Sequence, residues 1–580
     1  MAVIGIDLGT TNSLMAWWKD GEAAMIPNSL GSWLTPSVVS VMGEEVLVGE
    51  AAKERLLTCK DATAAAFKRF MGTRKKYELD GREFTPVELS ALVLRKLKQD
   101  AEACLGEEIR EAVISVPAYF NDRQRRDTRL AAQLAGLKTE RLINEPSAAA
   151  LAYQMQQGEG EACLLVFDFG GGTLDISLVE YFDNVIEIEA VAGDNHLGGN
   201  DVDRLLYGDF IHRHEELAGL DEEGTAGLKK ALTEAKCLLG AKEKQDFTYT
   251  YGDLTVEDEI TQEQLLTLGL PMLERIRRLF SKVLQDGQYR AEDVGDVIMV
   301  GGSSQLYFVQ RFVEELFQKP PVIMESPELA VAKGMGCYAG IRMRDAHIRD
   351  RMMTDVCPFT LGTDVVWGRK DERAHMCPVL ERNCPLPSSK TVRLYTTSGN
   401  QTFMRVGIYQ GEEYYVDENL WLGELVINVR ERPAGEESIA VTFSYDINGI
   451  LQVEAVNAMN QKVTRLIAND ALNEKEIEDS LRRLEEMRLH EEEEYQLLLA
   501  RLSWLYVQQS GERREYTGRV IHSLEQARAQ GRHRAYRKAE ERAQAWLVQA
   551  SAAMDVFGPA SMESMGKVME EEYEEEWDGQ

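Results

Sequence analysis

Two segments of this 580-residue chain combine a carboxylate, a glycine turn and threonine in the same order. They are Asp7-Leu8-Gly9-Thr10-Thr11-Asn12 and, about 160 residues later, Asp168-Phe169-Gly170-Gly171-Gly172-Thr173-Leu174-Asp175. A glycine turn lets backbone N–H groups approach a phosphate, and threonine hydroxyls can donate to it. One such turn also occurs in simple hairpins. Two copies, the second with three consecutive glycines, predict two related half-domains that clamp a nucleotide between them.

Carboxylates accompany both turns. Asp7, Asp168 and Asp175 suit a hard cation such as Mg²⁺, which keeps most of its own water when it binds a protein. A third glycine turn, Val300-Gly301-Gly302-Ser303-Ser304, follows an apolar run and opens a predicted helix. Such a junction can admit an adenosine or its phosphates, although it is equally typical of a plain strand-to-helix loop. Together the three turns predict a site for ATP with Mg²⁺.

The elements that must hold these turns follow an α/β pattern as far as about residue 347. Apolar runs at 3–6, 112–116, 164–167 and 297–300 are typical of buried strands. Residues 86–105 place apolar side chains at helical spacing, which predicts a helix covering one face of a sheet.

Beyond about residue 355 the spacing of the apolar residues changes. Residues 425–429 and 439–443 are strand-like, and Asn448-Gly449 is a strong hairpin signal. This predicts a separate β unit over 355–467. Helical spacing returns over 468–555, and the run of glutamates within 556–580 repels itself, which predicts a disordered acidic tail.

The composition limits the classes of partner. The chain has 97 Asp and Glu against 65 Lys and Arg, a formal charge of -32, so its surface repels nucleic acid and anionic lipid. We found no apolar stretch of membrane-spanning length and no signal peptide, which favours a cytoplasmic protein without membrane or nucleic-acid partners. Its eight cysteines show no zinc spacing. Cys377 and Cys384 are close in sequence, but we interpret them as ordinary loop cysteines rather than as metal or redox partners.

Several longer motifs then resemble the signatures of the 70-kilodalton heat-shock (DnaK-type) chaperones. Besides the first two glycine turns they are Val116 to Asp122, Ile143 to Ala150, Ala192 to Asp201 and Leu472 to Ile477. The resemblance covers about residues 1–485, and Asp355 to Gly362 with the short C-terminal region is most similar to the HscC branch. It implies an actin-like α/β ATPase over 1–347, with two lobes built from ribonuclease-H-like halves. An interdomain linker over 348–354, a β-sandwich peptide-binding domain over 355–467 and an α-helical lid over 468–555 would follow.

The resemblance also implies roles for individual residues. Lys68 would place its ammonium beside the γ-phosphate, although from sequence alone it is one surface lysine among many. Asp7, Asp168 and Asp175 would position Mg²⁺, K⁺ and the attacking water, Thr173 would donate to phosphate, and Glu145 would order that water. The residues expected to contact ATP or ADP are Gly9, Thr10, Thr11, Asn12, Gly170, Gly171, Gly172, Thr173, Lys236, Gly301, Gly302, Ser303 and Glu328.

Further positions would connect the two domains or hold the peptide. Pro117 and Arg125 match the family's proline switch and arginine relay, while a buried proline at a strand edge is the structural alternative. Met352 and Met353 stand where the family's linker has leucines and are left to supply its apolar contact, so we expect weaker docking of the linker. Val366, Leu394, Met404 and Val406 align with the peptide groove, and for each of them a place in the β core is at least as good an interpretation.

The predicted adenosine side departs from the family pattern. Thr233, Cys237 and Gly240 replace family residues, Gln305 stands for an arginine, and Lys236 is kept. We therefore expect weaker nucleotide binding and faster exchange than in the general chaperones.

The resulting hypothesis is an ATP-dependent chaperone and ATPase that binds exposed apolar segments of client polypeptides. A J-domain cochaperone and a nucleotide exchange factor would be its partners. The alternatives are a degenerate, nucleotide-gated holdase with weak turnover, a sugar or acetate kinase of the same superfamily, and an actin-like filament protein. The β and helical regions have no use in the last two.

Overall fold

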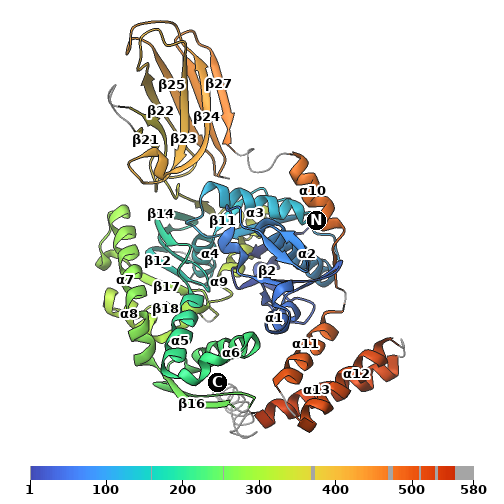
Figure 1. The fold of residues 1–580 in the computed structure, drawn as a ribbon. Helices are drawn as coiled ribbons and strands as arrows, with labels where there is room; N and C mark the ends of the chain where they lie inside the picture. Colours follow the sequence, from blue (N-terminus) through green and yellow to red (C-terminus); the bar gives the residue numbers. More distant parts are fainter. Residues whose placement is uncertain are drawn as a thin grey trace.

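The computed structural model describes residues 2–554 apart from 158–159, 253, 325, 367–372, 448, 468–473, 491, 509–510 and 530–532. The predicted acidic tail, 556–580, lies outside the described residues. Figure 1 shows a large α/β region, a β unit standing on one end of it, and helices α10 to α13 along one side.

The α/β region contains two six-stranded sheets that repeat one topology. In each, three consecutive antiparallel strands are followed by two strands parallel to the first of them. The first sheet has the order β11 (Leu142–Asn144), β10 (Glu111–Val116), β1 (Val3–Asp7), β2 (Asn12–Lys19) and β3 (Glu22–Ile26), with β4 (Thr35–Pro36) beside β2. The second has the order β18 (Val322–Ile323), β17 (Asp296–Val300), β12 (Glu161–Phe169), β13 (Leu174–Phe182), β14 (Val185–Asp194) and β19 (Met352–Thr354). The four predicted strands all lie within these sheets.

Two helices pack against each other between the sheets. They are α4 (Glu145–Gln157) and α9 (Ala330–Arg342), and one apolar core joins them to strands of both sheets. Close approach requires glycine here, because a Cβ on Gly334 would lie 1.8 Å from the Ala148 carbonyl oxygen. A Cβ on Gly5 would lie 2.3 Å from the backbone of Met335. Glycine therefore fixes α9 against both β1 and α4.

Other helices cover the outer faces of the two sheets. The predicted helix 86–105 is α2 (Pro86–Leu105), which begins with a capping box between Thr85 and Glu88. It packs with α3 (Asp122–Leu134) beside the first sheet. The second sheet is covered by α5 (Gly199–Arg213), α6 (Glu222–Leu239), α7 (Gln262–Gly287) and α8 (Tyr307–Phe317).

Smaller elements complete the α/β region. They are α1 (Glu50–Thr58), β5 (Val38–Met42), β6 (Glu45–Val48), β7 (Thr63–Ala65), β8 (Tyr77–Leu79), β9 (Arg82–Phe84), β15 (Lys244–Tyr251) and β16 (Leu254–Thr261).

The β unit consists of two four-stranded antiparallel sheets that share one apolar core. One has the order β21 (His375–Leu380), β20 (Leu361–Val365), β23 (Phe403–Gln410) and β24 (Leu420–Asn428). The other has the order β22 (Ser388–Tyr395), β25 (Ser438–Tyr445), β26 (Leu451–Asn457) and β27 (Lys462–Leu466). Buried and half-buried positions alternate along β25 and β26, as the sequence period predicts.

The segment before the β unit is added to the second sheet as a strand. β19 pairs in parallel with β14, with Met352 opposite Val185 and Met353 opposite Ile186. Met353 is buried in the core between the sheets, whereas 62% of Met352 is exposed. Backbone pairing and a single methionine therefore attach this segment, so the expectation of an apolar contact from both methionines was wrong for Met352.

Helices α10 (Glu474–Glu485), α11 (Glu493–Gln508), α12 (Gly511–Ala529) and α13 (His533–Met554) lie along the first half of the α/β region (Figure 1). The chain is extended between α10 and α11, and there β28 (Arg488–Leu489) pairs in parallel with β6. Met487 lies just beyond the end of α10. Further along, Glu54 of α1 pairs with Lys230 of α6 at 3.1 Å and with Arg501 of α11 at 3.4 Å. Lys230 Nζ also lies 5.7 Å from the centre of the Trp504 ring of α11, so the helical region contacts the rims of both halves.

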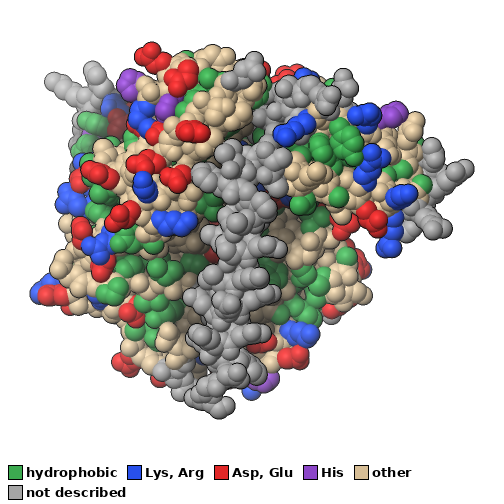
Figure 2. All heavy atoms as spheres, turned by 90° about the horizontal axis from the view of Figure 1, so that it is seen from below, with side chains coloured by type: hydrophobic (Ala, Val, Ile, Leu, Met, Phe, Trp, Pro, Cys, Tyr) green, Lys and Arg blue, Asp and Glu red, His purple; other side chains and the backbone are tan. Residues whose placement is uncertain are grey.

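No helix within the described ranges is both long enough and apolar enough to cross a membrane. Figure 2 shows acidic and basic side chains interspersed with apolar ones over the face seen from below.

Candidate nucleotide-binding site

The first two glycine turns face each other between the two sheets. A Cβ on Gly171 would lie 2.1 Å from the Thr11 hydroxyl oxygen, and one on Gly172 would lie 2.5 Å from the Thr10 methyl carbon. Only glycine allows the turns to pack so closely. α5 begins beside the second turn, where the amide of Gly199 donates to the Gly170 carbonyl at 3.0 Å. A helix N-terminus at a glycine turn favours an anion such as phosphate.

A cavity of about 490 Å³ opens between the two halves. Its walls include all but one of the residues predicted to bind nucleotide or to act on it. The structure therefore brings together side chains from β1, α4, β12, α6 and the third glycine turn. The predicted residues that line the cavity are Asp7, Gly9, Thr10, Thr11, Asn12, Lys68, Glu145, Asp168, Gly170, Gly171, Gly172, Thr173, Lys236, Gly301, Gly302, Ser303 and Glu328. Asp175 is buried but does not line it; its Oδ1 accepts a hydrogen bond from the Tyr119 amide at 3.0 Å.

Lys68 lies inside the molecule. Only 3% of the residue is exposed, and its Nζ lies 2.7 Å from Glu145 Oε1. A short 3₁₀ helix, Phe67–Phe70, directs the side chain into the cavity, where Nζ lies 5.6 Å from the centre of the Phe120 ring. A lysine is rarely buried unless it is paired. The interpretation of Lys68 as a surface lysine was therefore wrong, and its place beside the γ-phosphate, which the family resemblance implies, stays a prediction.

Buried carboxylates gather around this lysine. Burial raises the pKa of Asp7 to about 7 with a further rise from the charge of Glu145, while Lys68 and a hydrogen bond from Ser115 oppose the shift. Burial and Glu145 also raise the pKa of Asp175 to about 7. The pKa of Asp168 is raised well above its usual value by burial and by Glu145, Asp175 and Asp7. The cluster therefore carries more potential negative charge than Lys68 can balance, which favours an added cation.

The donor chemistry fits a largely hydrated Mg²⁺. Within the described residues, no three His, Cys, Asp or Glu side chains converge closely enough to enclose a metal ion by themselves. Mg²⁺ does not need such an enclosure, because it usually binds through one or two carboxylates, phosphate oxygens and its own water. Asp7 and Asp168, both on the cavity wall, are suitable carboxylates.

The residues that depart from the family pattern line the same cavity. They are Thr233, Cys237 and Gly240, and Lys236 between them is held by Asp203 at 2.6 Å. Gln305 donates to Glu328 at 3.2 Å. Tyr307 and Asp203 also line the cavity. Sequence analysis missed both, since neither belongs to a glycine turn, although Asp203 is one helical turn after Gly199.

Comparisons with known proteins agree with this geometry. The family profile described as Hsp70 protein matches residues 3–569. The chaperone protein DnaK of Thermotoga neapolitana is 38% identical over 511 residues, and that of Thermosipho africanus is 37% identical over 517 residues. Each match covers 85% of this chain and 85% of the relative. The chain belongs to the Hsp70 family.

In this Hsp70 chain, Arg125 lies between the nucleotide region and the linker. Its guanidinium donates to the Ala118 and Phe120 carbonyls and, at 2.6 Å, to Asn144 Oδ1. Asn144 Nδ2 then donates to Asp355 at 2.8 Å. Pro117 begins the loop that Arg125 holds, directly after β10. The predicted relay residue is therefore connected through Asn144 to Asp355, in the segment that leads into the β unit.

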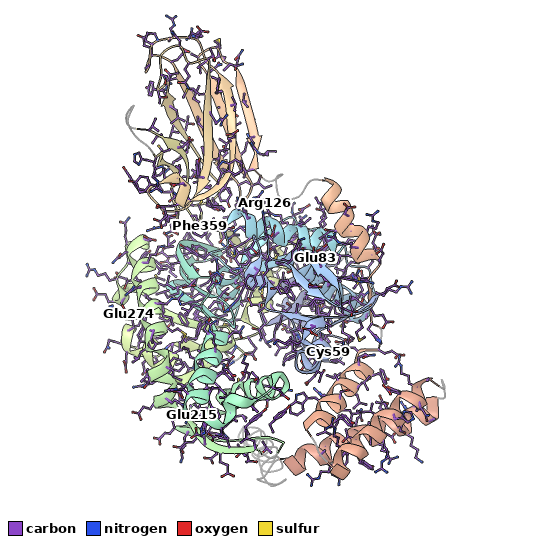
Figure 3. The ribbon with its side chains drawn as sticks, in the orientation of Figure 1. Cys59, Glu83, Arg126, Glu215, Glu274 and Phe359 are labelled. Atoms are coloured by element: carbon purple, nitrogen blue, oxygen red, sulfur yellow. The ribbon has the colours of Figure 1, made fainter. Side chains whose placement is uncertain are left out.

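A second connection starts at Asp175. Tyr119 donates its amide to Asp175, and its ring lies 4.4 Å from that of Phe359 between ring centres. Figure 3 shows Phe359 and Arg126, the latter on α3, both in the region where the β unit meets the α/β region. Arg126 donates to the Ile467 carbonyl at 3.3 Å, and the Asp122 amide donates to Gln410 at 3.1 Å. The Tyr119–Phe359 contact joins residues 240 apart, and no sequence signal indicated it.

The predicted peptide-contacting residues lie in different environments. Met404 and Val406 are 6% and 0% exposed within the β core, so they form part of its packing in this conformation. Leu394 is half-buried against that core, and Val366 is 42% exposed. Their role in peptide binding stays a prediction.

Proposed function

We propose that nucleotide in the cleft between the two halves controls how tightly the β unit binds exposed apolar segments of client polypeptides. As an Hsp70, the chain is an ATP-dependent molecular chaperone and an ATPase. What remains to be assigned is how its own residues divide these tasks.

The observation that carries this proposal is the unbroken set of contacts from the carboxylate cluster to the β unit. Asp175 holds the Tyr119 amide, and Tyr119 packs on Phe359. A shift of Asp175 when its cation and nucleotide change would move the Tyr119 backbone and with it the surface under Phe359. Two sites coupled in this way influence each other equally, because linkage is reciprocal.

Hydrolysis would take place beside Lys68 and Glu145. Lys68 would stabilise the charge that develops on the transferred phosphoryl group, and Glu145, held by Lys68, would orient the attacking water. Thr10 and Thr173 would donate to phosphate oxygens. Asp7 and Asp168 would hold Mg²⁺, which neutralises phosphate charge when bound. K⁺ would bind near the same carboxylate and phosphate groups.

Single-turnover hydrolysis by the full-length protein tests this function. We expect slow hydrolysis of bound ATP that an apolar model peptide accelerates several-fold. Hydrolysis indifferent to peptide would refute the coupling, and nucleotide-dependent peptide binding without hydrolysis would favour the alternative of a nucleotide-gated holdase.

Phe359→Ala is expected to reduce the peptide stimulation about 2- to 10-fold, because a packed aromatic pair contributes roughly 0.5–1.5 kcal/mol beyond its buried area. Basal hydrolysis should not change, since Phe359 lies outside the cavity. Phe182→Ala is a suitable control, because Phe182 is 41% exposed and distant in sequence from the Tyr119–Phe359 contact. The ratio of single-turnover rates with and without peptide is the measurement, and equal ratios in both variants would contradict the role of this contact.

Finer assignments belong to the same proposal. We assign 1–347 as an actin-like ATPase domain with ribonuclease-H-like halves, 348–354 as the linker, 355–467 as the β-sandwich substrate domain and 468–555 as the lid. The repeated sheet order and the shared core of the two β sheets support this division. We further propose membership of the HscC branch on the basis of Asp355 to Gly362, a cytoplasmic location, and a J-domain cochaperone and nucleotide exchange factor as partners.

A further inference from the structure

Two cysteines from separate segments meet where the linker enters the β unit. The amide of Cys357 donates to the carbonyl of Cys384 at 3.0 Å, and Val356 and Pro385 beside them form an antiparallel bridge. Directly opposed residues of an antiparallel pair have Cα atoms about 5.5 Å apart, a separation that a disulfide spans. Cys377, the neighbour of Cys384 in sequence, lies instead in β21 opposite Thr363.

The two thiols differ in character. Cys357 is fully buried, and contact with Cys384 together with burial raises its pKa well above the usual value. Cys384 is only half-buried. The neighbouring Cys357 thiol lowers the pKa of Cys384 to about 7, with Ser388 and the charge of Lys390 acting in the same direction and burial opposing it, while Cys357 Sγ also lies 3.0 Å from the Phe359 carbonyl oxygen. A half-exposed thiol that is about half ionised at neutral pH is the reactive member of such a pair.

We propose that Cys384 and Cys357 form a reversible disulfide when the protein meets a small-molecule disulfide. The Cys384 thiolate attacks one sulfur of the reagent, its S–S bond breaks, and one thiolate leaves. The Cys357 thiol then gives up its proton and attacks the Cys384 sulfur, which releases the second thiolate. The protein dithiol is oxidised by two electrons and one reagent disulfide is reduced to two thiols.

The position of the pair gives this modification a consequence for domain docking. Just before Cys357, Asp355 accepts hydrogen bonds from Asn144 at 2.8 Å and Ser147 at 2.9 Å. Just before Cys384, Arg382 pairs with Asp286 of α7 at 2.6 Å. The disulfide would therefore tie together two anchors that hold the β unit to the two halves of the α/β region. A crosslink compatible with the docked form removes freedom chiefly from the undocked form, so oxidation favours docking.

Treatment of the full-length protein with oxidised glutathione tests the chemistry. Peptide mapping without reduction should find Cys357 joined to Cys384, and a reducing thiol should reverse the link. Cys357→Ser should leave Cys384 as a mixed disulfide with glutathione, while Cys377→Ser should form the same internal link as the natural sequence. Alkylation of Cys384 in Cys357→Ala should also be slower at pH 7, because alanine, unlike serine, has no hydrogen to offer the Cys384 thiolate.

Absence of the internal link, or a link from Cys384 to Cys377, would overturn the proposal. The effect on docking is read from hydrogen exchange at the Met352 amide, which donates to Asn184 at 2.8 Å in the docked form. We expect exchange at least about threefold slower after oxidation in Cys377→Ser and no change in Cys357→Ser. Equal exchange before and after a link has formed would overturn the docking effect.

Discussion

Replacing Lys68 with alanine is expected to lower the single-turnover rate of ATP hydrolysis by at least about 100-fold, the usual cost of losing one group that stabilises transition-state charge. Lys68 is buried beside Glu145, and the carboxyl groups of Asp7 and Asp168 line the same cavity. Its ammonium is therefore the side-chain charge best placed to oppose both these carboxylates and the reacting phosphoryl group. Binding of a fluorescent ADP should remain measurable, since the glycine turns and threonines are unchanged.

Two further variants separate catalysis from folding. Lys68→Met keeps most of the side-chain volume and should be as slow as Lys68→Ala, so a cavity left by alanine cannot account for the loss. Lys76→Ala is the matched control, because Lys76 is an exposed lysine paired with Glu83 at 2.6 Å on the surface. It should hydrolyse ATP at the natural rate. If either Lys68 variant kept more than a tenth of that rate, the assigned role would be wrong.

The nucleotide site could be predicted from sequence because its signals are local. The first two glycine turns carry their own carboxylates and hydroxyls within a few residues, the third carries serine hydroxyls, and all three line one cavity. Strands such as 112–116 and the helix 86–105 were also predictable, since burial on one or both faces leaves a period in the sequence. Even the pairing of the two halves followed from a repeated motif.

Contacts between residues far apart in the sequence could not be predicted in the same way. Lys68 meets Glu145 across 77 residues, and Asn144 meets Asp355 across 211. Neither period nor composition records such pairs, and only the family resemblance indicated that Lys68 and Arg125 matter. Met404 and Val406 show a different difficulty. An apolar residue on a strand has the same sequence signal whether it binds a peptide or fills a core.

Charge reversal at Glu493 is expected to release the helical region from the first half of the α/β region. Glu493 is 7% exposed and lies 2.8 Å from the ammonium of Lys96, which also pairs with Asp100 at 2.7 Å. Glu493→Lys would place a second ammonium in this buried site, and leaving a buried charge unpaired costs roughly 3–5 kcal/mol. Dissociation of the helical region from the α/β region has the lower free energy, because the introduced ammonium is then solvated and Lys96 stays paired with Asp100.

Hydrogen exchange at Arg488 and His490 measures this release. In the docked form their amides donate to Glu44 at 2.9 Å and to Val46 at 3.0 Å, so Glu493→Lys should speed their exchange at least about tenfold. Glu494→Lys makes the same change of charge at the neighbouring exposed position and should leave both amides protected. If the two variants exchanged at the same rate, the buried pair could not be what holds β28 on β6. Faster exchange in Glu493→Lys than in Glu494→Lys would instead show that the Lys96–Glu493 pair holds β28 on β6. The two variants have the same net charge and differ in position by only one residue.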